Sequence, residues 1–301
     1  MIFDFAIAFE GLSDIDAWAI AAIAVKAVGY AAAFLAMGGA LFIAVFPELP
    51  EKIGRSTRIL TASAAVIGLL NLSLRIGVRA ARISGMGADG MIDPTMVQIV
   101  WESPLGTAAF IQAMGFGLIL ALLLRGPIPA ALSLIGATLV AIAFTEVGHS
   151  LGGERAFLAA LLTLHVLTGA FWIGAFHPLF MATDNSEGHA ILHRFGKIAG
   201  ASVAVLVLAG LGFAWISVGS LAGLFGTAYG LTLMAKVALV LVLLALAAWN
   251  KLLLVPGLRT GEPGTALRLK RSIALECGAV VLIFLLTATL TSVATPPMNL
   301  D

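Results

Sequence analysis

Long apolar runs, each about as long as a membrane-spanning helix, dominate the pattern of hydrophobic and polar positions along the chain. A helix needs about 20 mostly apolar residues to cross the hydrocarbon core of a bilayer. Eight runs meet this requirement, near residues 17–46, 58–79, 105–124, 128–147, 156–181, 196–218, 228–250 and 273–294. Prolines fall mainly in the gaps, where helices are expected to end. The pattern predicts an all-α polytopic integral membrane protein, a bundle of eight transmembrane helices.

The composition leads to the same class of protein. Of the 301 residues, 60% are hydrophobic and only 11% are charged, whereas about 25% are charged in an ordinary soluble domain. The net charge of +1 gives no basis for binding nucleic acid. The single cysteine, Cys277, lies in an apolar run and has no partner for an internal disulfide. We expect it to be a small buried core residue.

The distribution of Lys and Arg between the loops predicts the orientation, because short cytoplasmic loops carry the excess of cations. One set of connections holds eleven cations, namely Lys52, Arg55, Arg58, Arg125, Arg194, Lys197, Lys251, Arg259, Arg268, Lys270 and Arg271. The opposite set holds three, namely Arg79, Arg82 and Arg155. Both termini are therefore predicted on the outer, periplasmic side.

We expect a single transmembrane domain over residues 1–301, because no loop is long enough for a separate soluble domain. The segments "AFLAMGGALF" in the first run and "AFWIGAFHPLF" in the fifth resemble each other weakly. This similarity suggests two related four-helix halves, at about 1–147 and 148–301.

Ionisable side chains within the apolar runs gather toward the predicted outer half of the membrane. Each costs about 2.5–3.5 kcal/mol on insertion scales, so each requires a compensating interaction. Lys26, His165 and Lys236 lie about eight or nine residues in from the outer face. Glu146 and His149 stand at the outer end of the fourth run. We expect these groups to surround a shared pocket below the outer surface.

Helical spacing places some of these side chains on common faces. His165, Thr168 and Trp172 share one face of the fifth helix, and Glu146 and His149 are three residues apart. The turn between the fourth and fifth runs is short and rich in glycine. His149 and His165 are therefore expected to approach each other.

Other runs contribute polar or soft side chains at similar depth, namely Tyr30, Met114, Tyr229 and Met234. The inner half is poorer, with Glu276 just inside the eighth run. Simpler explanations exist for single residues. A lone histidine can hydrogen-bond between helices, and the two lysines can extend toward the outer surface.

The outer loop after the second run contains methionines at a regular spacing of five, Met86, Met91 and Met96. Thioether sulfur is a soft ligand that favours Cu(I), and methionine in contact with solvent has little packing value. The alternative is a short interfacial helix that buries these side chains in lipid. The end of the second run presents a basic face made of Arg75, Arg79 and Arg82. This face either pairs with nearby acids or receives an anionic partner.

Over residues 140–297 the chain resembles the CopD/PcoD family of copper-resistance membrane proteins. The similarity rests on "LHVLTGAFWIGAFHPL", on the preceding "GHS", and on the segments "HRFGKIAG", "TAYGLTLMAKVAL", "WNKLLLVPGL" and "LKRSIALECG". The resemblance implies a bacterial inner-membrane protein that carries copper from periplasm to cytoplasm. It places His149 and His165 at the family's histidine positions. It also matches the family's C-terminal pattern to Tyr229, Gly230, Lys236, Asn250, Pro256 and Glu276.

Residues and resemblance together predict a copper transporter rather than an enzyme, with Cu(I) favoured over Cu(II). The candidate metal ligands are His149, His165, Glu146, Met86, Met91, Met96, Met234 and Met114. The candidate supporting polar or packing residues are Lys26, Tyr30, Arg75, Thr168, Trp172, Tyr229, Lys236 and Glu276. The absence of a Walker-type loop argues against ATP-driven pumping by the chain itself.

Two other functions fit part of the pattern. Histidines on neighbouring helices with nearby cations can bind haem b, which would make the chain a haem- or quinone-linked oxidoreductase similar to HemJ-type protoporphyrinogen oxidase. The third hypothesis is a non-catalytic scaffold that binds a periplasmic copper-carrier protein through the methionine loop.

Overall fold

The computed structural model describes residues 16–147, 155–185, 188–218, 224–225 and 228–292. It is an all-α polytopic membrane protein, and no strand occurs in these ranges. The elements follow in the order α2 (Ala17–Val45), α3 (Glu51–Ser84), η1 (Gly87–Met91), α4 (Pro94–Trp101), α5 (Pro104–Ile119), η2 (Leu120–Leu123), α6 (Pro127–Ala143), η3 (Phe144–Glu146), α7 (Arg155–Ala182), α8 (Gly188–Val218), α10 (Ala228–Trp249), η5 (Asn250–Leu254), α11 (Val255–Arg259) and α12 (Thr265–Leu290).

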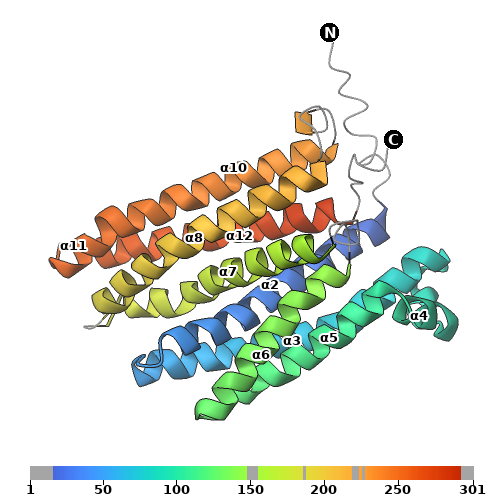
Figure 1. Cartoon of the computed structure of the whole chain (residues 1–301), viewed down its shortest axis with the longest axis horizontal. Coiled ribbons are helices and arrows are strands. Elements are labelled where there is room, and N and C mark those ends of the chain that lie inside the picture. Colours follow the sequence, from blue (N-terminus) through green and yellow to red (C-terminus); the bar gives the residue numbers. More distant parts are fainter. Residues whose placement is uncertain (1–15, 148–154, 186–187, 219–223, 226–227, 293–301) are drawn as a thin grey trace, which may run out of the picture.

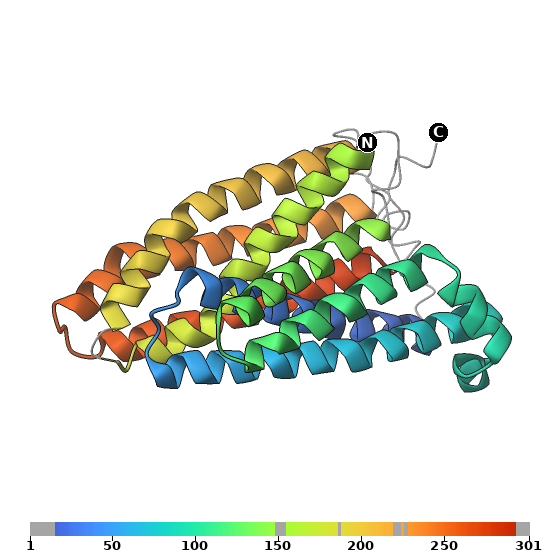
Figure 2. The same cartoon turned by 60° about the horizontal axis from the view of Figure 1, so that its bottom comes forward.

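The prediction of eight membrane-spanning helices is confirmed for this described part of the chain. The helices are longer than the apolar runs in several places: α3 begins at Glu51, α8 at Gly188 and α12 at Thr265. The residues added at these helix starts include charged and polar side chains. They can continue the helix because this part of it lies beyond the apolar core, where water solvates its end. The loop 85–103 folds into η1 and α4, at the end of the bundle where α2 begins (Figures 1 and 2).

Helix α2 lies at the centre of the bundle and packs against α3, α7, α6 and α12 (Figure 1). Its close approaches depend on glycine. A Cβ atom on Gly38 would lie 1.9 Å from the carbonyl oxygen of Ala170 in α7, and a Cβ atom on Gly174 would lie 2.1 Å from the backbone of Gly38. A Cβ atom on Gly39 would lie 1.9 Å from Thr61 Oγ1 in α3. Small residues at membrane crossings let backbones meet in this way.

Helices α5 and α6 form a second tight pair, in which α5 packs on α3 and α6 packs on α2. Gly115 and Gly136 face each other across this pair, and a Cβ atom on either would come within 2.7 Å of the other's carbonyl oxygen. Side-chain caps fix the starts of α4 and α5: Asp93 Oδ1 accepts the amide of Met96, and Ser103 Oγ accepts the amide of Leu105. The first half of the chain is thus closely packed.

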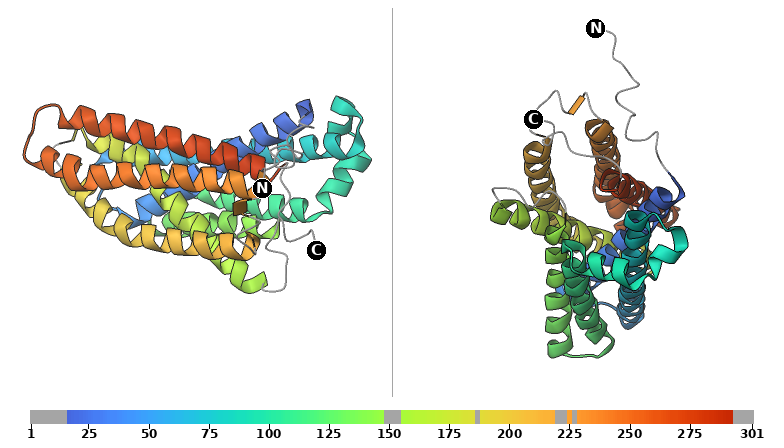
Figure 3. Two further views of the ribbon diagram at one scale, coloured as in Figure 1. Left: turned by 90° about the horizontal axis from the view of Figure 1, so that it is seen from above. Right: turned by 90° about the vertical axis from the view of Figure 1, so that its right-hand side faces the viewer.

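The later helices are arranged more openly. Helix α8 packs on α7, α10 packs on α12, and α8 also contacts α11 (Figure 3). Much of α8 and α10 faces outward, where Leu208 is 70% exposed and Leu241 is 61% exposed. Cys277 is exposed on α12, so the expectation of a buried core cysteine is wrong. Its helical face points outward, while Glu276 next to it points inward.

The end of the bundle that holds the α2–α3 and α7–α8 turns is bordered by ion pairs. Arg125 pairs with Glu51 at 3.0 Å, and Lys270 pairs with Asp184 at 2.6 Å. Two further pairs join Arg194 to Glu48 and Arg268 to Glu262. This end carries most of the cations that predict a cytoplasmic location.

Candidate functional site

His165 lies at the contact between α7 and α8. Its Nδ1 atom is 3.0 Å from the carbonyl oxygen of Leu206 in α8. The ring rests against Gly210, where an added Cβ atom would lie 2.9 Å from His165 Cε1. Gly210 is four residues after Leu206, so the missing side chain at 210 uncovers the carbonyl that the histidine uses. The α7–α8 crossing therefore fixes the orientation of the imidazole.

This hydrogen bond determines which ring nitrogen can bind a ligand. A carbonyl oxygen only accepts, so Nδ1 carries the hydrogen and donates it. The neutral ring then presents its lone pair on Nε2, which has no hydrogen-bond partner among the residues that the structure describes. Metal-binding histidines are commonly oriented in this way by a carbonyl on the other nitrogen. Lys236 on α10 lies close enough for its charge to act on His165.

Thr168 and Trp172 continue the His165 face of α7 without forming a ligand set. The hydroxyl of Thr168 donates to the carbonyl of Leu164 at 2.7 Å, within its own helix. Trp172 is 5% exposed and packs in the aromatic core with Phe171 and Phe176.

A cavity of about 220 Å³ opens further along this face, between α7, α8, α10 and α12. Trp172 lines the end nearer His165, while Asn250, Lys251 and Glu276 supply its polar groups. The remaining wall is mostly apolar. Because Trp172 is seven residues after His165, it lies about 10 Å further along the helix. The cavity thus lies in the predicted inner half of the bundle, where the candidate site residue named from the sequence is Glu276.

The carboxyl group of Glu276 is 3% exposed and accepts a hydrogen bond from Asn250 Nδ2 at 2.5 Å. Asn250 begins the π-helical turn η5, and π-turns are frequent at functional sites. Two nearby oxygens, Asn250 Oδ1 and Ser272 Oγ, are buried and have no hydrogen-bond partner among the described residues. Residues 250 and 276 come from different helices, so their contact has no local sequence signal.

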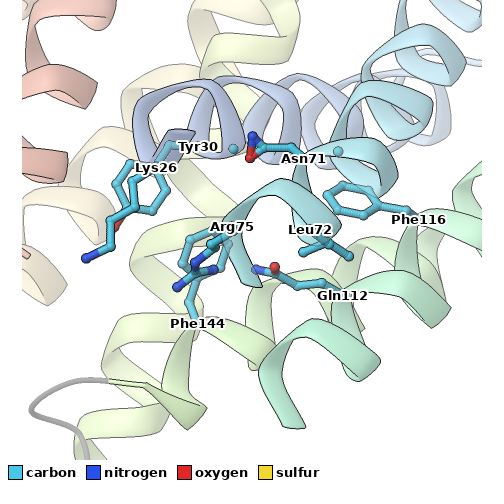
Figure 4. Close-up of a pocket in the computed structure, with 10 residues that line it drawn as sticks. Lys26, Tyr30, Asn71, Leu72, Arg75, Gln112, Phe116 and Phe144 are labelled. Carbon is cyan, nitrogen blue, oxygen red and sulfur yellow. The ribbon is translucent and has the colours of Figure 1, made fainter. Parts of the chain in front are cut away.

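Lys26 and Tyr30 belong to a separate polar group. Lys26 Nζ donates to the carbonyl oxygen of Thr291, after the end of α12, and the Tyr30 hydroxyl is 3.0 Å from Thr291 Oγ1. Both side chains also border a small cavity beside Arg75 (Figure 4). Lys26 therefore contacts Thr291, whereas His165 contacts Leu206. The sequence predicts that both residues lie at a similar depth in the membrane.

The small cavity contains two residues that the sequence analysis missed. The side chains of Asn71 and Gln112 are buried, and both line the cavity (Figure 4). Asn71 Nδ2 donates to the carbonyl of Val25 at 3.1 Å. The sequence signal that could have identified them is the side-chain amide that each places within an apolar run, Asn71 in the second run and Gln112 in the third.

The candidate methionines are spread over the molecule. Met91 packs beside Ala22 and Val78, and Met96 packs against the main core, so the assumption that they lack packing partners is wrong. Met86 is 53% exposed. The outward-facing Met114 and Met234 are 48% and 38% exposed. The role of the three loop methionines as a shared copper site stays a prediction.

Three further candidates have less structural detail. Glu146 ends η3 and is partly buried. His149 and the side chain of Tyr229 lie outside the described residues, so the predicted approach of His149 to His165 stays a prediction. Within the described ranges, no three His, Cys, Asp or Glu side chains gather closely enough to hold a metal ion.

Comparison with known families gives two matches that cover most of the chain. The model for the N-terminal domain of copper resistance protein D-like proteins matches residues 15–157. The model for copper resistance protein D matches residues 189–290. The chain belongs to the CopD family. The resemblance noted in the sequence is thereby confirmed, and it extends to the first half.

Two curated members resemble this CopD-family chain over most of its length. The copper transport protein CutJ of Bacillus subtilis (strain 168) is 27% identical over 266 residues, which are 82% of this chain and 47% of that protein. Copper resistance protein D of Pseudomonas syringae pv. tomato is 29% identical over 255 residues, which are 77% of this chain and 82% of that protein. The chain thus spans about half the length of the Bacillus relative. No solved structure matches it.

Proposed function

We propose that this CopD-family chain is a copper transporter of the bacterial inner membrane that carries Cu(I) from the periplasm to the cytoplasm. The proposal rests on one observation above all: the Leu206 carbonyl holds His165 with Nε2 free to bind. A neutral imidazole is a good copper ligand. Two relatives bear names of copper transport and copper resistance, which supports copper as the substrate.

His165 supplies one ligand, and Cu(I) needs at least one more. His149 is the second ligand in this proposal, because the resemblance to CopD proteins matches it, like His165, to one of the family's histidine positions. Glu146 adds a carboxylate at the same rim. The exposed Met86 provides a soft group at the outer surface where copper first meets the chain.

The inner part of the route is the large cavity with Glu276. A cation that leaves His165 passes Trp172 on the same face of α7 and reaches a space containing the Glu276 carboxyl. The carboxyl can offset positive charge in surroundings where an unpaired ion is costly. Asn250 holds the carboxyl in place through its amide.

Copper uptake into proteoliposomes tests this function. Purified wild type should move Cu(I) into the vesicles, and His165→Ala should lose most of this activity together with its copper affinity. His193→Ala is the matched control, because His193 is exposed near the start of α8 and should behave as wild type. Equal binding and uptake in His165→Ala and wild type would refute the proposed role of His165.

A further inference from the structure

Arg75, which lines the small cavity, has no acidic partner among the described residues. Arg75 Nε is buried and has no hydrogen-bond partner in the part of the chain that the structure describes. The four ion pairs found among the described residues involve neither Arg75 nor Lys26. A buried charge is expensive unless it is paired. This uncompensated guanidinium therefore indicates a missing anionic partner.

Nearby positive charges strengthen this requirement. Lys26 borders the same cavity, and the charges of Arg75, Arg79 and Arg82 all act on it. None of the described residues that line the cavity is acidic. The acids of the neighbouring loop, Asp89, Asp93 and Glu102, form no ion pair with these cations in the described part of the chain.

Most polar neighbours of Arg75 are already occupied. Lys26 and Tyr30 bond to Thr291, and Asn71 Nδ2 bonds to Val25. Gln112 differs: its side chain is 5% exposed and makes no hydrogen bond to the described residues. Its amide is turned toward Arg75 (Figure 4). Arg75 and Gln112 therefore leave N–H groups available for one guest.

The cavity is too small for most anions. Its volume is about 20 Å³, which is room for a single water-sized or slightly larger species. Phe116, Phe144 and Leu72 close it with apolar surface (Figure 4). Tetrahedral oxyanions such as sulfate exceed this space and would bring a second charge.

We propose that this cavity binds one small monovalent anion of the size of chloride, held by Arg75 and Gln112. The anion compensates the buried guanidinium and reduces the repulsion between Arg75 and Lys26. This site goes beyond the proposed copper transport, because its donors carry hydrogen and are unsuited to a metal cation. It lies in the first half of the chain, apart from His165 and Glu276.

Thermal unfolding of the detergent-purified full chain tests the site. Chloride replaces gluconate at constant ionic strength, and the wild-type midpoint should rise by on the order of 5 °C at saturating chloride. Bromide should act similarly, whereas sulfate should give no such rise. Arg75→Gln should abolish the chloride effect, and Gln112→Leu should weaken it. Arg79→Gln is the control, because Arg79 is exposed one turn away and does not line the cavity.

Direct binding keeps the test decisive if Arg75→Gln does not fold. Equilibrium dialysis with radioactive chloride should give one ion per chain for wild type and Arg79→Gln, and a lower affinity for Gln112→Leu. No bound chloride in wild type would show that only water occupies the cavity and would overturn the proposal. A chloride effect of equal size in the Arg75→Gln variant would overturn it as well.

Discussion

In the first half of the chain, α5 meets α6 through glycines at backbone distance and α2 meets α7 in the same way, whereas α8 and α10 in the second half leave a cavity between them. Half of the most apolar window of α2 is buried within the protein, against 6% of the corresponding window of α10. Helices that hold others in position need close packing, whereas the proposed path for copper needs space between helices. The contrast suggests that the first half holds α7 in place while the second half accommodates a passing ion.

The strongest test of the tight half is Gly38→Ala. The added methyl group would meet the Ala170 carbonyl at 1.9 Å, and the backbones of α2 and α7 would have to separate. Overpacking of this kind typically costs about 1–3 kcal/mol and occasionally more. We expect a large fall in the thermal unfolding midpoint in detergent. Gly117→Ala should change it little, since nothing lies within 4 Å of that position. Similar midpoints for both variants would contradict the tight crossing.

The open half is tested by Glu276→Gln. Glutamine keeps an oxygen that can accept the Asn250 hydrogen bond, so the variant should fold and bind copper at His165 as wild type does. It lacks the carboxylate in the cavity, so copper uptake into proteoliposomes should fall to a small fraction. Glu262→Gln removes a half-exposed acid and is the control. Full uptake by Glu276→Gln would exclude this carboxyl from the route.

A finer test concerns the orientation of His165. Gly210→Ala would place a methyl group 2.9 Å from His165 Cε1 and rotate the ring away from Leu206. Loss of such a supporting contact typically weakens metal affinity by about 10- to 100-fold. Equilibrium Cu(I) titration measures this change. Gly212→Ala is the matched control, because its nearest neighbour would be at an ordinary 3.4 Å. Equal affinities would mean that the Leu206 contact does not orient a ligand.

The smallest expected effect comes from the ion pairs at the end of the bundle. Arg125→Gln removes a pair with Glu51 in which both side chains are largely exposed. Exposed pairs typically contribute about 0–1 kcal/mol and are screened by salt. The midpoint should drop slightly at low salt and match wild type at high salt. A large drop that persists in high salt would show that this pair has a greater structural role than its exposure implies.

The fold could be predicted from the sequence because a membrane-spanning helix is a local property of about 20 residues. The site could be predicted only in part. His165 was identifiable because an imidazole is unusual in lipid, but its bond to Leu206 depends on a helix crossing and on Gly210. Lys26 was expected beside His165, and it bonds to Thr291 instead. The depth of a residue in the membrane can be estimated from the sequence. Which neighbouring helix its side chain contacts depends on how the whole bundle packs.

The π-helical turn at Asn250–Leu254 also sets the phase of the chain that follows it. A π-turn contains about one residue more than an α-turn, so later residues are rotated by about 100° relative to an uninterrupted α-helix. That rotation determines which side of α11 meets α8. Deleting one residue between 250 and 254 would restore the α-helical phase and turn the buried Gly257 outward. When related chains are aligned, the number of residues in this turn therefore matters as much as their identity, because it determines which side of α11 faces α8.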